Sequence, residues 1–122
     1  MITMGTESEQ FFQNMLRFLP STHSEYKESV NHYGEVLETV IIEDIFMPEI
    51  FRLMKTGENP ELLKNIFKYF ESVSNSKDSK LVNNFSVTVL EILGSYKELF
   101  EIAQNYMGPK TKQLLDETIK LM

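Results

Sequence analysis

The sequence predicts an all-α fold of six to seven short antiparallel helices, stacked as a HEAT-like right-handed superhelix or as an irregular bundle. Apolar residues recur at three- and four-residue spacing along most of the 122 residues, as on the buried face of amphipathic helices. Capping motifs, Pro and Gly separate these periodic stretches. The stretches that begin at positions 62 and 81 align at a displacement of 19 residues, and two helices in roughly 40 residues is the period of HEAT-type repeats.

The first two predicted helices open on capping boxes, in which the two end residues satisfy each other's backbone N–H groups. Residues 6–9 (TESE) form the first box, and Pro20 ends the helix that follows. Residues 22–25 (THSE) form the second box. The helix that it opens places a regular stripe of side chains inward: Tyr26, Val30, Tyr33 and Leu37. Gly34 lies within this helix and weakens it by about 1 kcal/mol relative to Ala.

The middle of the chain is expected to contain two longer helices. The first carries an apolar pattern from Ile41 onward and ends near Gly57. Because Pro48 interrupts it, we expect a kink or two short helices there. Asn59 followed by Pro60 is a favourable start for the next helix, with Asn as the N-cap and Pro at the first helical position.

The segment 81–93 (LVNNFSVTVLEIL) is the one stretch whose pattern fits two structures. Its centre alternates like a strand and is rich in β-branched residues. The helical frame accounts for more of its apolar positions, so we interpret it as a nearly buried helix that Gly94 ends. Residues 95–98 (SYKE) form a third capping box, and Gly108-Pro109 separates the last two helices.

Composition favours one domain spanning residues 1–122, with a single core. The chain has no Cys, which excludes disulfides and thiolate metal sites. No apolar run approaches the roughly 20 residues that span a bilayer, and the N-terminus lacks a signal-peptide pattern. A net charge of −6 argues against nucleic-acid binding, which needs a basic surface. We therefore expect a cytoplasmic protein that binds neither membrane nor nucleic acid.

The excess negative charge lies in one segment, residues 25–50. Of the 18 acidic and 12 basic residues, seven acids and one base lie there, which leaves eleven of each elsewhere. Within it, the stretch 34–50 (GEVLETVIIEDIFMPEI) contains five carboxylates and no basic residue. The sequence predicts that these five contact a basic partner: Glu35, Glu38, Glu43, Asp44 and Glu49.

Motifs for catalysis, cofactors and metals are missing from the sequence. It has no HExxH, no glycine-rich phosphate loop and no Glu-x-x-His pair. Glu28 and His32 are four residues apart and could touch a metal together, although this spacing is common on exposed helices. The carboxylate pairs Glu35/Glu38 and Glu98/Glu101 fit solvated helix faces better than acid–base chemistry. We therefore expect a protein that is not an enzyme and holds no cofactor or metal.

Three stretches together resemble a known family: IFKYFESVSNS (66–76), VTVLEIL (87–93) and YMGPKTKQLL (106–115). In this order and spacing they resemble small bacterial proteins of unknown function that are all-helical and HEAT-like. The resemblance covers roughly residues 34–120 and leaves the N-terminal helices, 1–33, outside. Some similar small helical proteins are encoded beside polymorphic toxins and act as immunity proteins. The resemblance implies a fold and no catalytic residues.

Two function classes follow from these observations. The first is a protein-binding module, most concretely an immunity protein that covers the basic groove of a cognate bacterial toxin with its acidic segment. The second is a helical domain that binds a metal or a small ligand near Pro48, where a helix break leaves carbonyl oxygens beside carboxylates. A structural homodimer without chemistry is compatible with the first class.

Overall fold

The computed structural model describes residues 6–121, and every regular element within them is helical, which confirms the all-α prediction. In chain order the elements are α1 (Glu7–Phe18), a 3₁₀ turn (Pro20–Thr22), α2 (His23–Tyr33), α3 (Glu38–Ile41), a first π turn (Ile42–Phe46), α4 (Met47–Thr56), α5 (Pro60–Ser74), α6 (Ser79–Phe85), a second π turn (Ser86–Leu90), α7 (Glu91–Ser95), α8 (Lys97–Gln104) and α9 (Pro109–Leu121). Each π turn joins its two neighbours into one continuous helix, α3–α4 and α6–α7. None of these helices is long and apolar enough to cross a membrane.

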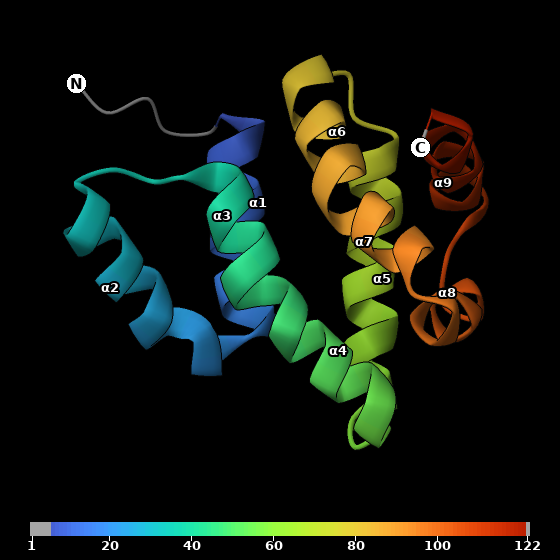
Figure 1. Ribbon diagram of the computed structural model, residues 1–122, viewed down its shortest axis with the longest axis horizontal. Helices are drawn as coiled ribbons and strands as arrows, with labels where there is room; N and C mark the ends of the chain where they lie inside the picture. The colour runs from blue at the N-terminus through green and yellow to red at the C-terminus, as the bar shows by residue number, and fades with distance from the viewer. Residues whose placement is uncertain (1–5, 122) are drawn as a thin grey trace.

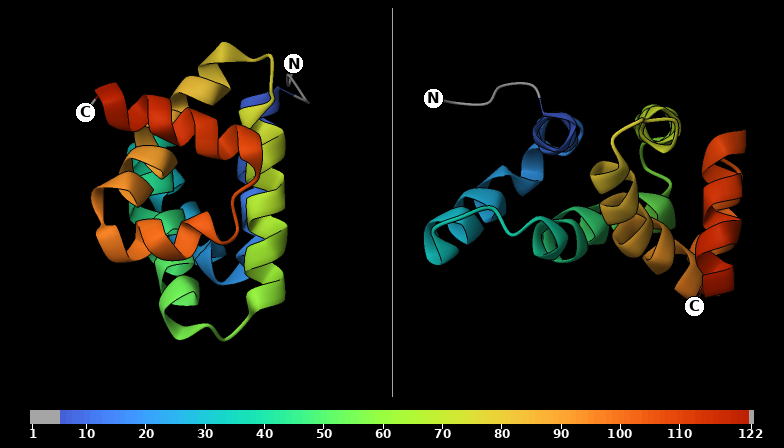
Figure 2. Two further views of the ribbon diagram at one scale, coloured as in Figure 1. Left: turned by 90° about the vertical axis from the view of Figure 1, so that its right-hand side faces the viewer. Right: turned by 90° about the horizontal axis from the view of Figure 1, so that it is seen from above.

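When α3–α4 and α6–α7 are each taken as one helix, successive helices alternate in direction from α1 to α7, while α8 and α9 run across the end of the molecule (Figures 1 and 2). The central helix is α5, which packs against α1, α4, α6 and α9. The displacement of 19 residues noted in the sequence is the spacing between two capped helix starts, since Asn59 caps α5 and Asp78 caps α6. HEAT-like stacking of these helices stays a prediction.

The core lies around α5, which has five fully buried apolar side chains on one face: Leu63, Ile66, Phe67, Phe70 and Val73. Their spacing of three and four residues is the helical period read from the sequence. Aromatic rings from other helices join them, and Phe70 packs edge-on against Phe85 of α6 with 5.1 Å between ring centroids. This cluster holds the middle and C-terminal helices together.

The two π turns explain how the chain passes Pro48 and the strand-like segment. Met47 N–H donates to the carbonyl of Ile42, five residues back, so the helix widens just before Pro48 and then continues. The predicted interruption is therefore a wide turn within one helix. The second π turn contains the alternating residues of 86–90 and buries Thr88, Val89 and Leu90, so its side chains are enclosed on more than one face. The two turns pack against each other.

Two of the four predicted helix starts have the expected capping bonds. Thr6 Oγ1 accepts from Glu9 N–H at 3.1 Å, and Asn59 Oδ1 accepts from Leu62 N–H at 3.1 Å. The hydroxyl of Thr22 instead donates to the carbonyl of Leu19 at 2.6 Å, because a 3₁₀ turn precedes α2.

The third predicted capping box, at residues 95–98, is also wrong. Ser95 is the last residue of α7, and its hydroxyl donates to the Glu91 carbonyl at 2.7 Å. The predicted end at Gly94 is displaced by one residue, to Ser95. Gly94 is instead a close-packing position, because a Cβ there would lie 3.2 Å from Cγ1 of Ile119 on α9.

Glu71 of α5 caps the start of α9. Its carboxylate accepts from the backbone N–H groups of Lys110 and Thr111 and from the Thr111 hydroxyl, each at 2.9 Å. A Cβ at Gly108 would lie 2.5 Å from the same carboxylate, so the approach requires glycine. The Ser74 and Thr111 hydroxyls are 2.9 Å apart beside it. Burial alone would raise the pKa of Glu71, but these hydrogen bonds outweigh it and lower the pKa.

We expect Glu71→Ala to lower the free energy of unfolding by about 2 kcal/mol at neutral pH, because it removes the cap of α9 and leaves three donors without their acceptor. Since the folded-state pKa of Glu71 is depressed, its contribution is complete above the unfolded pKa of about 4.3 and is lost as the pH falls through the folded value. Urea unfolding of the variant and wild type between neutral and acidic pH measures both effects. Glu101→Ala, at an exposed position of α8, is the control. Equal stability of Glu71→Ala and wild type at neutral pH would contradict the assignment.

Candidate functional site

Helix α2 differs from the other long helices because it has no buried side chain. It lies at one side of the molecule, next to α1 and α3 (Figure 1). The predicted inward stripe of the second helix is wrong at its C-terminal end: Tyr33 is 53% exposed, and Leu37 lies beyond the helix. Gly34 adopts a left-handed conformation (φ 74°) that ends α2 and separates it from α3. Tyr26 of α2 packs against the edge of the core, while much of the rest of the helix is exposed and available to a partner.

One groove runs between α2 and the first π turn, and we name it the acidic groove. It measures about 610 Å³. Carboxylates from both walls line it, with Glu25 and Glu28 on α2 and Asp44 on the π turn. Ser29 also faces the groove, and its buried hydroxyl oxygen has no hydrogen-bond partner among residues 6–121. Glu25 and Glu28 belong to the acidic segment 25–50 but lie outside the five residues that the sequence predicts to contact a partner.

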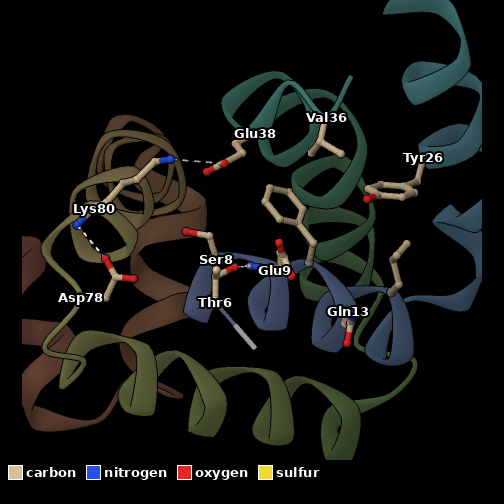
Figure 3. A pocket seen from close by; sticks show the side chains of 11 residues that line it. Thr6, Ser8, Glu9, Gln13, Tyr26, Val36, Glu38, Asp78 and Lys80 are labelled. Carbon is tan, nitrogen blue, oxygen red and sulfur yellow. Dashed lines mark hydrogen bonds and ion pairs between the residues drawn. The ribbon is translucent and has the colours of Figure 1, made fainter. Parts of the chain in front are cut away.

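A second groove runs between α1 and α2, and we name it the α1–α2 groove (Figure 3). It also measures about 610 Å³, and its apolar lining is Phe12, Leu16, Tyr26 and Val36. Figure 3 shows Tyr26 and Val36 on the wall opposite α1. Partial burial raises the pKa of Tyr26, so the phenol stays neutral at physiological pH. No motif in the sequence indicated this groove, because it arises from the position of α2 against α1.

Three of the five predicted partner-binding residues are exposed: Glu35, Glu43 and Asp44. Glu35 lies in the connection between α2 and α3, while Glu43 and Asp44 lie on the first π turn. Within residues 6–121, no basic side chain forms an ion pair with any of these three, or with Glu25 and Glu28. These five carboxylates outnumber Lys27, the one lysine of α2, and give the surface around α2 a negative potential.

The structure separates the other two predicted residues, Glu38 and Glu49, from this surface. Glu38 accepts a hydrogen bond from the amide of Asn84 at 2.8 Å and lies 3.8 Å from the ammonium of Lys80, so it connects α3 to α6. Its side chain is 28% exposed. Both partners lie more than 40 positions away in the sequence, and this contact uses the Glu38 carboxylate inside the fold.

Glu49 is occupied by Arg52, one turn further along α4. The Arg52 guanidinium donates to both Glu49 oxygens, at 2.9 and 2.7 Å, and also pairs with Glu58 at 2.5 Å. The hydrogen bond from Arg52 lowers the pKa of Glu49, and partial burial opposes this effect only in part. The five predicted residues thus divide into three free carboxylates and two that stabilise the fold.

Potential metal ligands do not converge within residues 6–121, where no group of three or more His, Asp or Glu side chains could hold an ion. Glu28 and His32, the pair that the sequence offered, both line the acidic groove without a third ligand. The His32 ring instead packs edge-on against Tyr33, with 4.6 Å between centroids.

We expect the backbone amides of α2 to exchange with solvent much faster than those of α5, because α2 buries no side chain that would oppose its local opening. Hydrogen exchange of the free protein, followed by mass spectrometry, measures this difference. The amides of α5 serve as the internal reference. Equal protection of the two helices would show that α2 opens only with the whole fold.

Comparison with known proteins identifies a family and no characterised relative. No curated protein matches the chain, and no solved structure does. The model of one family, described as "Domain of unknown function (DUF7674)", matches residues 12–121. The match begins within α1 and includes all of α2, whereas the resemblance noted from the sequence covered residues 34–120. The surface around α2 therefore lies within the matched region, and the chain belongs to the DUF7674 family.

Proposed function

We propose that this protein is a non-enzymatic binding module that recognises a basic protein through the free carboxylates around α2. The observation that supports this most is the grouping of five exposed or groove-lining acids without ion pairs: Glu25, Glu28, Glu35, Glu43 and Asp44. A surface of this kind attracts a basic partner over long range and speeds its association. The most concrete form of the proposal is an immunity protein that neutralises a cognate bacterial toxin in the cytoplasm.

The position of these acids also suits a partner of some size. They lie on α2, on the connection to α3 and on the first π turn, so a partner that contacts all of them must extend over three elements. A nuclease toxin would present such a surface, because it needs a basic groove for its own polyanionic substrate. In this arrangement the core helices hold the acidic surface in place, and no covalent chemistry is involved.

The two alternative functions, metal binding and homodimer formation, have less support from the structure. A metal-binding role would need ligands that converge, and the part of the chain that the structure describes has no group of three. A homodimer would use exposed apolar side chains such as Val87 or Leu121, which lie far from the acidic groove in sequence. Both alternatives stay predictions of the sequence.

We expect the triple variant Glu35→Lys/Glu43→Lys/Asp44→Lys to associate at least about tenfold more slowly with the basic protein that co-purifies from the native cells. Its association should also become less dependent on salt, because the attraction between opposite charges is removed. Surface plasmon resonance at several salt concentrations measures both quantities. In a toxin pair, the same variant should lose its protection of cells that express the toxin.

The matched control is Glu101→Lys/Asp116→Lys/Glu117→Lys, at exposed positions of α8 and α9. Each triple variant replaces three acids by three bases and so changes the net charge from −6 to 0. The control should bind nearly as fast as wild type. If both variants slow association equally, only the total charge matters and the proposed surface is wrong.

A further inference from the structure

The α1–α2 groove carries an apolar surface that no side chain of residues 6–121 fills. Val36 on its upper wall is 40% exposed, although it is a β-branched apolar residue. Leu16 and Tyr26 are only half-buried and pack against the edge of the core. A groove of about 610 Å³ lies between them. Its volume falls within the usual range of binding sites of roughly 300–1,000 Å³.

The shape of the groove follows from the helical spacing of α1. Ser8, Phe12 and Leu16 are each four residues apart and so lie along one face of the helix. At 1.5 Å per residue this face is about 12 Å long, which corresponds to roughly two turns of a helix laid alongside. Tyr26 and Val36 form the opposite wall (Figure 3). An apolar surface of this length between two walls is the kind of surface on which amphipathic helices bind.

The charges at the rim select the kind of helix that fits. Three carboxylates line the groove, Glu9, Glu38 and Asp78, against a single cation, Lys80. Lys80 lies 3.8 Å from Glu38, and Asp78 caps α6, so both of these acids have partners inside the fold. Glu9 is exposed and forms no ion pair with any residue from 6 to 121, and Glu35 adjoins Val36. An acidic segment would be repelled here, whereas Lys or Arg would be attracted.

We infer that the α1–α2 groove binds an amphipathic, basic helix of the partner protein. The apolar face of that helix covers Phe12, Leu16 and Val36, and its Lys or Arg residues pair with Glu9 and Glu35. This inference rests on the proposed function, in that the partner is a basic protein. It adds a second contact to α2, through Tyr26, next to the contact at the acidic groove. Helix α2, which has no buried side chain in the free protein, would then contact the partner at both grooves.

A second copy of this chain is a poorer occupant, because each copy has a net charge of −6 and would bring further acids to an acidic rim. A self-association test therefore belongs with the binding test. Analytical ultracentrifugation of the wild type should show a monomer. A dimer that Val36→Glu dissociates would assign the groove to a second copy and overturn the inference.

The direct experiment uses a synthetic amphipathic helix of Leu and Lys, long enough for about five turns, as a fluorescent probe. Anisotropy titrations compare wild type with Val36→Glu and with the matched control Val87→Glu. Val87 is 42% exposed on the second π turn, outside the groove, so the two variants share the same chemical change at nearly the same exposure. Unchanged melting temperatures of both variants show that each is folded.

We expect Val36→Glu to weaken binding of the probe at least tenfold and Val87→Glu to leave it unchanged. Both variants add one negative charge, which by itself would strengthen binding of a cationic peptide, so a loss at Val36 alone reports the apolar contact. A peptide in which Glu replaces every Lys should not bind. Equal affinity of the two variants for the Leu/Lys probe, or no binding of that probe to wild type, would overturn the inference.

The same set of proteins separates this inference from the proposed function. If the acidic-surface variant Glu35→Lys/Glu43→Lys/Asp44→Lys impairs binding of the natural partner while Val36→Glu does not, the groove inference fails and the proposed function stands. If Val36→Glu impairs partner binding and Glu43→Lys/Asp44→Lys, which leaves Glu35 intact, does not, the α1–α2 groove is the site and recognition through the carboxylates of the first π turn is wrong.

Discussion

The hydrogen bonds from the start of α9 to the Glu71 carboxylate fix the C-terminal third of the molecule to its central helix. They place α9 against α5, α7 and the second π turn, and the absence of a Cβ at Gly108 is what allows the carboxylate to reach these donors. Two of the stretches that resemble the family, 66–76 and 106–115, meet at this contact. These two stretches therefore contain the residues that join α9 to α5.

The opposite end of the fold has no comparable closure. Helix α1 is tied to the α5–α6 connection by the Ser76 hydroxyl, which donates to Glu7 at 2.6 Å, but α2 has no buried side chain on either face. A helix that contributes little to the core is free to bind a partner, because the buried contacts of the other helices stabilise the fold. In this protein α2 lies next to both the acidic groove and the α1–α2 groove. The packed helices around α5 thus support α2 and the carboxylates of the first π turn, which remain exposed at the surface.

Much of the fold could be predicted from the sequence, and the failures have local physical causes. The all-α class and the starts at Thr6 and Asn59 follow from helical periodicity and capping chemistry, which act within a few residues. Helical periodicity places Gly34 inside a helix, whereas in the structure it adopts a left-handed conformation and ends α2. The roles of Glu38 and Glu49 depend on where Asn84, Lys80 and Arg52 come to lie. Charge density along the chain predicted the acidic surface, but only tertiary contacts decide which carboxylates stay free.

Binding of a basic protein around α2 is tested most directly by hydrogen exchange of the protein in complex with the partner that co-purifies from its native cells. Exchange rates in the complex are compared with those of the free protein at every peptide. The account predicts that protection increases over residues 23–44 and on α1, while α8 and α9 are unchanged. Protection confined to α8 and α9, with α2 exchanging as fast as in the free protein, would contradict it.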